Sequence, residues 1–344
     1  MTKTWGISTL LLAASCIRPI GTSGEPAPSA PQTAAASTPE DLRDNPIAAA
    51  AAEPPWRDLV RHTTVSAPSR VTHPGPSRDG SRVCYASTEF GGRPRIVLRD
   101  SFGAAPTQIT QNESDNLFPR ISPDGKRVAY ASNREGNFDI YVARLDAPQA
   151  VTRVTTDPED EIAPSWSPDG KRLVYSARRQ GDLWQVVIAD VGSRVKTFLG
   201  PGLYPDWSPD ANDPWICFQS QPREAGGRSA VWVVRPDGTS LRELSGDRAR
   251  AWSAITPRFS PDGRWVAYAT VHRSPESRAF GAPDEADDVW IVRPDGTLDT
   301  RLTDDVSAEW WPAWGGDRVF FISNRGGERN LWSVQVKPLE ELEK

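Results

Sequence analysis

A motif with a leading proline recurs six times and continues into a Ser-Pro-Asp-Gly turn in its three clearest copies, so the chain must fold as an array of similar units. The clearest copies are FPRISPDGKRVAYASNREGNFDIYVARL from Phe118, APSWSPDGKRLVYSARRQGDLWQVVIA from Ala163 and TPRFSPDGRWVAYAT from Thr256. Weaker copies start at His73, Tyr204 and Trp311. The leading prolines are Pro74, Pro119, Pro164, Pro205, Pro257 and Pro312. Their spacings of 45, 45, 41, 52 and 55 residues are typical of propeller blades.

Each unit reads as four short strands. The first carries an aromatic residue in most copies (Trp166, Trp207, Phe259, Trp314) and ends at the Ser-Pro-Asp-Gly turn, where Pro fixes φ and Gly supplies a positive φ. The second is rich in β-branched and aromatic residues, and a polar hairpin leads to a third with Tyr or Trp. The fourth ends in a threonine at Thr110, Thr155 and Thr303. The pattern predicts an all-β, six-bladed propeller of four-stranded antiparallel blades.

The two ends of the repeat region are predicted to meet. The sixth unit ends after its third strand, NLWSVQV, and the segment 58–63 resembles the fourth strands of the other units. An N-terminal strand is therefore expected to close the ring and remove an exposed edge. Cys84 and Cys217 then lie in opposed blades, beyond the ~7 Å Cα separation that a disulfide allows, so we expect two buried free thiols.

The repeat SPDGKRVAYASNREGNFDIYVARLD closely resembles the WD40-like Pro-Asp repeat of the TolB propeller family, over residues 58–337. Proteins of the TolB type carry an α/β domain before six blades, and the N-terminal segment here is too short for it. The resemblance therefore implies a TolB-like lipoprotein without that domain. The partner it implies is the peptidoglycan-associated lipoprotein of the Tol-Pal envelope system.

The N-terminus predicts export. Residues 1–15 have one cation, Lys3, and an apolar run, and the string LAASC ending at Cys16 resembles a bacterial lipobox with Ala13 at a position that prefers Leu, Val or Ile. The alternative is an ordinary secretory signal with an incidental cysteine. Two or more acyl chains on Cys16 suffice for stable anchoring. Because Ile17 follows Cys16, analogy favours the outer membrane, facing the periplasm or the cell exterior.

Composition separates a tether from the folded domain. Residues 16–55 are dominated by Pro, Ala, Ser and Thr and are expected to form a flexible linker, followed by the propeller at 56–344. A hydrophobic content of 38% with 25% charged residues fits a globular domain, which we expect to be monomeric. The net charge of −5 argues against nucleic-acid binding, which needs a basic surface.

The variable face is the predicted binding surface. The Ser-Pro-Asp-Gly turns lie on one face, and the variable hairpins and inter-blade loops lie on the opposite one, where binding tends to sit. The residues before the leading prolines should ring the channel mouth on that face. The candidate contacts there are His73, Phe118, Tyr204, Trp252, Trp310 and Trp311. The alternative is that these side chains only plug the channel and pack blade edges.

Two hairpin features invite separate interpretations. The hairpin 271–287 is about ten residues longer than its counterparts and is either functional or a tolerated surface loop. Its candidate contacts are His272, Arg273, Arg278 and Phe280.

Hairpin arginines recur at Arg134, Arg179 and Arg325, and third strands begin at Asp139, Asp182, Asp288 and Asn330. This repetition predicts a structural Arg–Asp bond within each hairpin.

The sequence offers little for catalysis. It has three histidines, and lacks a Gly-x-Ser-x-Gly elbow, a phosphate-binding glycine loop and zinc-type Cys/His spacing. We expect a protein without a cofactor. The alternative is a Ca²⁺ ion in the channel, for which the acidic loops at 157–161 and 304–309 would provide oxygen ligands. The sequence favours a non-catalytic envelope scaffold that binds a protein or peptide. The alternatives are a metal-assisted hydrolase or lyase acting on a sugar or lactone, and a subunit of a larger surface complex.

Overall fold

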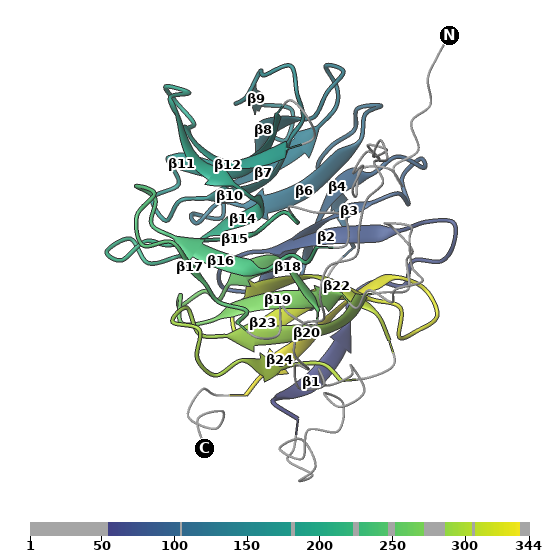
Figure 1. Ribbon diagram of the computed structural model, residues 1–344. Coiled ribbons are helices and arrows are strands. Elements are labelled where there is room, and N and C mark those ends of the chain that lie inside the picture. Colours follow the sequence, from purple (N-terminus) through teal and green to yellow (C-terminus); the bar gives the residue numbers. More distant parts are fainter. Residues whose placement is uncertain are drawn as a thin grey trace, which may run out of the picture. The chain divides into compact units, whose positions relative to one another are not determined.

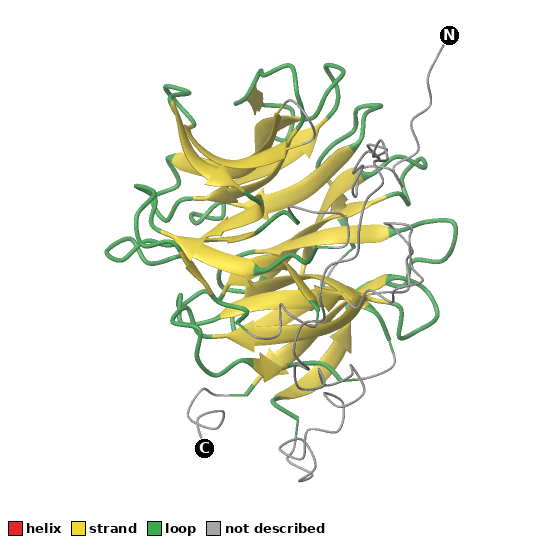
Figure 2. Cartoon of the chain, viewed as in Figure 1, coloured by secondary structure: helices red, strands yellow, loops and turns green. Residues whose placement is uncertain are grey.

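The computed structural model describes residues 54–103, 105–179, 183–222, 227–246, 252–271, 286–304 and 307–337. These residues form six four-stranded antiparallel sheets in succession, which confirms the predicted all-β propeller (Figure 1, Figure 2). The predicted signal peptide, Cys16 and nearly all of the linker lie outside the described residues. No helix among the described residues is long and apolar enough to cross a membrane.

The first three blades are formed by strands that follow one another in the chain. Blade 1 contains β2 (Val71–Pro76), β3 (Arg82–Ser87), β4 (Arg95–Asp100) and β5 (Thr107–Gln108). Blade 2 contains β6 (Asn116–Ile121), β7 (Arg127–Ser132), β8 (Asp139–Arg144) and β9 (Val151–Arg153). Blade 3 contains β10 (Glu161–Trp166), β11 (Arg172–Arg179), β12 (Leu183–Asp190) and β13 (Lys196–Pro201).

The last three blades follow the same order until the final strand. Blade 4 contains β14 (Leu203–Trp207), β15 (Ile216–Gln219), β16 (Val231–Val234) and β17 (Arg242–Glu243). Blade 5 contains β18 (Ser253–Phe259), β19 (Val266–Val271), β20 (Ala286–Val292) and β21 (Thr300–Arg301). Blade 6 contains β22 (Glu309–Gly315), β23 (Arg318–Ser323), β24 (Asn330–Val336) and, as its outer strand, β1 (Trp56–Arg61).

The first strands of the six blades contact one another in turn, and β22 contacts β2, so they surround a central channel. Each first strand carries a β-bulge at its leading proline. The residue before each leading proline has a positive φ between 51° and 55°. This left-handed conformation is costly for a side chain larger than glycine, so its sixfold recurrence identifies it as part of the scaffold. A bulge redirects side chains, and here it places a repeated position at the channel.

The Ser-Pro-Asp-Gly turn is closed by its own serine and aspartate. In blade 3 the Ser167 hydroxyl donates to Asp169 Oδ1 (2.5 Å) and accepts from the backbone N–H of Arg172 (2.9 Å). Arg127 of blade 2 donates to the Gly170 carbonyl in this turn (2.8 Å) and lies over the Trp166 ring at 4.6 Å. The turn therefore fixes both its own blade and the contact with the preceding one.

The recurring fourth-strand threonines have a structural role. Their hydroxyls accept third-strand N–H groups in the bonds Ile96–Thr110 (2.8 Å), Ile140–Thr155 (2.8 Å) and Val289–Thr303 (2.9 Å). In blade 6 the same bond runs from the Leu331 N–H to the Thr63 hydroxyl (2.9 Å). Thr63 thus takes the place of a fourth-strand threonine, although it comes from the other end of the chain.

Strand β1 closes the ring as predicted, two residues earlier than expected. It pairs antiparallel with β24 from Trp56 to Arg61, and a bulge between Arg57 and Val60 shifts its register. Arg318 of β23 secures the strand by a 2.7 Å ion pair with Asp58. Beyond β1 the pairing continues irregularly, with the His62 N–H donating to the Leu331 carbonyl (2.8 Å).

His62 joins three parts of the closure. Its Nδ1 lies 2.8 Å from the Ser101 carbonyl of blade 1, and its Nε2 lies 2.8 Å from the Ser333 hydroxyl of β24. Burial is the main cause that lowers the pKa of His62 to about 4, so the ring is neutral at physiological pH. Cys84 and Cys217 are both buried and free, as predicted.

We predict that His62 makes ring closure sensitive to acid. The unfolded chain takes up this proton near pH 6.5 and the folded protein only near pH 4, so protonation favours unfolding as the pH falls through this window. Above pH 6.5 the stabilisation is fully present. Relative to His62→Gln, the wild-type protein should lose up to about 3 kcal/mol of unfolding free energy between pH 6.5 and 4. Urea unfolding of both proteins across this range measures the difference, and equal pH dependence would contradict the prediction.

Candidate functional site

Aromatic residues close the channel on the side of the variable loops. The His73 ring lies 3.9 Å from Phe118 and 4.3 Å from Trp311, measured between centroids, and Phe118 lies 5.9 Å from Tyr204. His73, Phe118 and Tyr204 are buried, whereas Trp311 is half-buried. The structure thus brings four of the six predicted contact residues together as one aromatic layer across the channel.

The histidine in this layer is held neutral. Burial is the first cause that keeps the pKa of His73 well below its usual range, and the charges of Arg120 and Arg258 act in the same direction. Its Nδ1 is buried and has no hydrogen-bond partner within the described residues. His73 therefore contributes a flat, uncharged ring to the layer.

Half-buried aromatics lie between the last blade and the first. Trp310, Trp311 and Phe90, from the β3–β4 hairpin, all pack against one core cluster built from blades 1 and 6. The Arg329 guanidinium lies over the Trp310 ring at 4.3 Å. Trp252, one residue before β18 in blade 5, is also half-buried. We call Phe90, Trp310 and Trp311 the loop-side aromatic patch.

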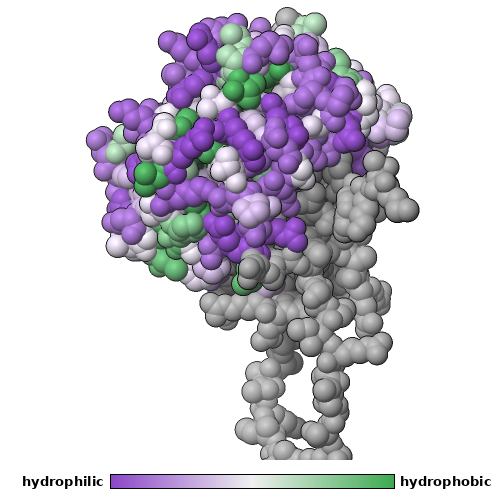
Figure 3. Space-filling view, turned by 90° about the horizontal axis from the view of Figure 1, so that it is seen from above, coloured by the Kyte–Doolittle hydropathy of each residue, from purple (hydrophilic) through white to green (hydrophobic). Residues whose placement is uncertain are grey.

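The candidate contacts of the long hairpin, His272, Arg273, Arg278 and Phe280, lie outside the described residues. Elsewhere the exposed large hydrophobic side chains lie mainly on outer strands and turns, such as Phe102, Leu183, Phe198 and Leu241. The face seen in Figure 3 is mainly hydrophilic, with hydrophobic residues in small separate areas.

The predicted Arg–Asp bond within the hairpins is wrong for blade 2. Arg134 donates to the Tyr130 hydroxyl (2.8 Å) and lies over the Tyr141 ring at 4.2 Å. Asp139 instead pairs with Arg153 of β9 at 2.7 Å. Blade 5 repeats this third-to-fourth-strand pairing, with Arg301 of β21 and Asp288 at 2.6 Å. The Asp139 carboxylate therefore pairs with the neighbouring fourth strand of its own sheet, and the hairpin arginine Arg134 packs on tyrosine rings instead.

The acidic loop proposed for calcium is neutralised by cations. Asp157 pairs with Lys196 at 2.7 Å and with Arg179 at 3.1 Å. Burial raises the pKa of Glu161 to about 8, and Lys196 Nζ also lies 3.5 Å from Glu161 Oε1. Within the described part of the chain, no group of three His, Cys, Asp or Glu side chains could hold a metal ion. Asp305 of the second acidic loop is not among those residues.

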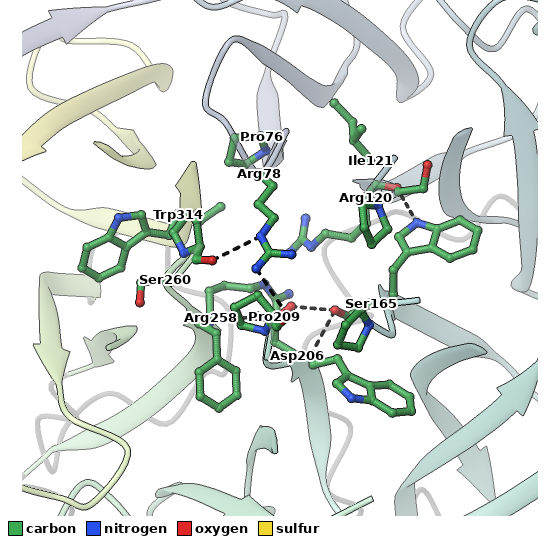
Figure 4. Close-up of a pocket in the computed structure, with 18 residues that line it drawn as sticks. Pro76, Arg78, Arg120, Ile121, Ser165, Asp206, Pro209, Arg258, Ser260 and Trp314 are labelled. Carbon is green, nitrogen blue, oxygen red and sulfur yellow. Dashed lines mark hydrogen bonds between the residues drawn. The ribbon is translucent and has the colours of Figure 1, made fainter. Parts of the chain in front are cut away.

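A second layer crosses the channel on the side of the Ser-Pro-Asp-Gly turns. It is formed by the residues that follow the leading prolines, namely Gly75, Arg120, Ser165, Asp206, Arg258 and Ala313. A cavity of about 120 Å³ opens here between the ends of the first strands and the turns (Figure 4). Its wall includes the first-strand aromatics Trp166, Trp207, Phe259 and Trp314. We call this space the turn-side cavity.

Two arginines from opposite blades reach into this layer. Arg120 Nη1 donates to the carbonyls of Pro74 (2.9 Å) and Pro119 (2.8 Å). Arg258 Nη1 donates to three carbonyls, the closest being that of Pro257 (2.9 Å). Burial and the charge of Arg258 lower the pKa of Arg120 to about 9, as expected for like charges that share a site.

The single carboxylate of the layer has other partners. Asp206 Oδ1 accepts from the Ser165 hydroxyl (2.7 Å), and Oδ2 accepts from the Phe259 N–H (2.8 Å). These bonds join blades 3, 4 and 5 beside the channel. No ion pair within 4.0 Å connects Asp206 to Arg120 or Arg258, all of which are described residues.

A third arginine lies across the mouth of the cavity. Arg78 occupies the place of proline in the first turn, which reads Ser-Arg-Asp-Gly. Its Nε donates to the Pro261 carbonyl (3.2 Å) and its Nη2 to the Pro209 carbonyl (3.3 Å), so the side chain reaches from blade 1 to blades 4 and 5 (Figure 4). The sequence analysis did not predict this cavity. Two features of the sequence pointed to it, namely Arg78 in place of the turn proline and the arginines that follow Pro119 and Pro257.

Comparison with known proteins agrees with this architecture. Residues 60–211 match the family model described as the TolB beta propeller domain. An uncharacterised protein of Agrobacterium fabrum is 29% identical over 136 residues, which is 38% of this chain and 39% of the relative, so the match spans well under two thirds of that protein.

Solved structures show the same fold. The structure of a putative TolB from Agrobacterium tumefaciens aligns with a TM-score of 0.60 at 23% identity, over 80% of this chain and 96% of that one. An oligogalacturonate lyase from Vibrio parahaemolyticus aligns with a TM-score of 0.55 at 16% identity, over 82% and 94% of the two chains. At these identities the alignments establish the fold alone.

We predict that Gly75 is required for the arginine layer. A Cβ at this position would lie 2.1 Å from the Pro119 carbonyl oxygen and 3.1 Å from Arg120 Nη1. Gly75→Ala should therefore displace the neighbouring strand and cost about 3 kcal/mol of unfolding free energy. The matched control is Gly103→Ala, whose Cβ has ordinary contacts at 3.6 Å and which should change stability little. Urea unfolding measures both, and an equally stable Gly75→Ala protein would contradict the prediction.

Proposed function

We propose that the protein is a non-catalytic binding scaffold of the bacterial cell envelope, and the match of residues 60–211 to the TolB beta propeller domain model supports this proposal. Its loop-side channel mouth recognises a protein or peptide. The observation that carries this proposal is the aromatic layer at that mouth, where His73 and Phe118 form a closed floor beside the half-buried Trp311.

The chemistry of this surface suits a polypeptide partner. Half-buried aromatic side chains offer a large contact area at low conformational cost and are enriched among the residues that dominate protein interfaces. Trp310 and Trp311 provide such area at the junction of blades 1 and 6, and Arg329 adds a positive charge above the Trp310 ring. The ordered core beneath the patch means that little has to be rearranged on binding.

The family and the N-terminus suggest where the scaffold acts. We propose that Cys16 is lipidated and anchors the protein to the outer membrane, with the sequence before residue 56 as the tether. The peptidoglycan-associated lipoprotein is the first partner to test. For the metal-assisted hydrolase or lyase, the described residues offer no support, since Lys196 and Arg179 already engage Asp157.

We predict that Trp310→Ala weakens partner binding. The purified protein is titrated with the soluble domain of the peptidoglycan-associated lipoprotein, and binding is measured by calorimetry. The wild-type protein should bind saturably. Trp310→Ala should weaken the affinity at least about tenfold, as expected for a central interface tryptophan. The control is Phe198→Ala, an exposed aromatic on the outer strand β13 of blade 3, which should bind like the wild type. Both variants are compared at a temperature where circular dichroism shows them folded.

Two results would count against the proposal. An absence of saturable binding rejects this partner. Equal affinities of Trp310→Ala and Phe198→Ala for the partner reject the loop-side aromatic patch as the contact surface.

A further inference from the structure

The turn-side cavity has an excess of positive charge. Arg78, Arg120 and Arg258 line it together with one carboxylate, Asp206. Both oxygens of Asp206 already accept hydrogen bonds, one from a hydroxyl and one from a backbone N–H. The guanidinium groups have only carbonyl oxygens as partners, which satisfy N–H donors without compensating charge.

Several donors in the cavity are unused. Arg258 is only 5% exposed, and its Nε is buried without a hydrogen-bond partner. Within the described residues Arg120 donates only through Nη1, which leaves Nε and Nη2 of its guanidinium available. Figure 4 shows the Arg78 and Arg120 side chains pointing into the same space. Of these three arginines only Arg258 has a buried donor without a partner, and a buried, unpaired cationic donor is costly, so the arrangement favours a bound anion.

We propose that the turn-side cavity binds an oxyanion, a carboxylate or phosphate group, between Arg78, Arg120 and Arg258. The planar guanidinium presents several N–H donors in a geometry that matches these groups. A cavity of about 120 Å³ has room for several water molecules or for one such group. The rest of the ligand extends outward past Arg78, which is exposed at the mouth.

This site lies at the opposite end of the channel from the loop-side aromatic patch. Arg120 and Phe118 are two residues apart on β6, with Phe118 in the aromatic layer and Arg120 in the turn-side layer. The aromatic layer separates the two ends, so an anion enters from the turns. The proposals of partner binding at the loop side and of anion binding at the turn side can therefore be tested independently, and failure of one does not contradict the other.

The test is anion-dependent stabilisation of the purified full-length protein. Thermal unfolding is measured in sodium phosphate, sodium acetate and sodium chloride at equal ionic strength, and affinity is measured by calorimetry. A ligand at ten times its Kd should raise Tm by about 3 °C over chloride. A short peptide with a free C-terminus and its C-terminal amide are compared in the same way.

Variants locate the effect in the cavity. Arg78→Pro restores the Ser-Pro-Asp-Gly turn of the other blades, so it should fold well while weakening anion affinity about tenfold. Arg120→Met should abolish the anion-dependent rise in Tm. The matched control is Arg144→Met, which removes an exposed arginine paired with Asp146 on the outer face of blade 2 and should leave the rise unchanged.

Each outcome decides the proposal. Stabilisation by phosphate alone assigns a phosphate ligand, and stabilisation by acetate or by the free but not the amidated peptide assigns a carboxylate. Either result supports the site if Arg78→Pro and Arg120→Met reduce it. No stabilisation beyond chloride overturns the proposal, and so does an equal rise in Tm in wild type, Arg78→Pro and Arg120→Met.

Discussion

The rest of the propeller depends on a backbone constraint that recurs six times, a left-handed residue followed by proline inside each first strand. Proline has no N–H to give to the sheet and fixes its own φ, so the ladder is interrupted there. The bulge that results bends the strand at the channel wall and leaves the strand ends to pair normally. Each blade thereby presents one residue before and one after its proline to the channel.

This constraint explains why the channel has two different layers. The six residues before the prolines have the unfavourable positive φ, and the aromatic contacts among His73, Phe118 and Trp311 help to offset its cost. The six residues after the prolines occupy the turn-side layer. Because the backbone geometry is the same in all blades, equivalent positions of a layer carry different side chains, as Gly75 and Arg120 do in the turn-side layer.

Much of the fold could be predicted because the repeat encodes local chemistry. Proline spacing marked the blades, the Ser-Pro-Asp-Gly turns marked the ends of the first strands, and the likeness of residues 58–63 to the other fourth strands revealed the N-terminal closing strand. The hairpin pairing failed because residue spacing does not show where a side chain points. Asp139 turns toward Arg153 across the sheet, and Arg134 prefers the Tyr141 ring. Such choices depend on burial and on neighbours from other strands.

The turn-side cavity could not be predicted for a related reason, because its residues depart from the repeat in different blades. Blade 1 has glycine where blade 2 has Arg120, and the missing side chain is what allows Arg120 to reach the Pro74 carbonyl. The same blade has Arg78 where the other turns have proline or glycine, and this side chain crosses to blades 4 and 5. In a symmetric scaffold, residues that match the repeat maintain the blades. Departures that converge on one space, here three guanidinium groups beside one carboxylate, are the ones that need a partner from outside the chain.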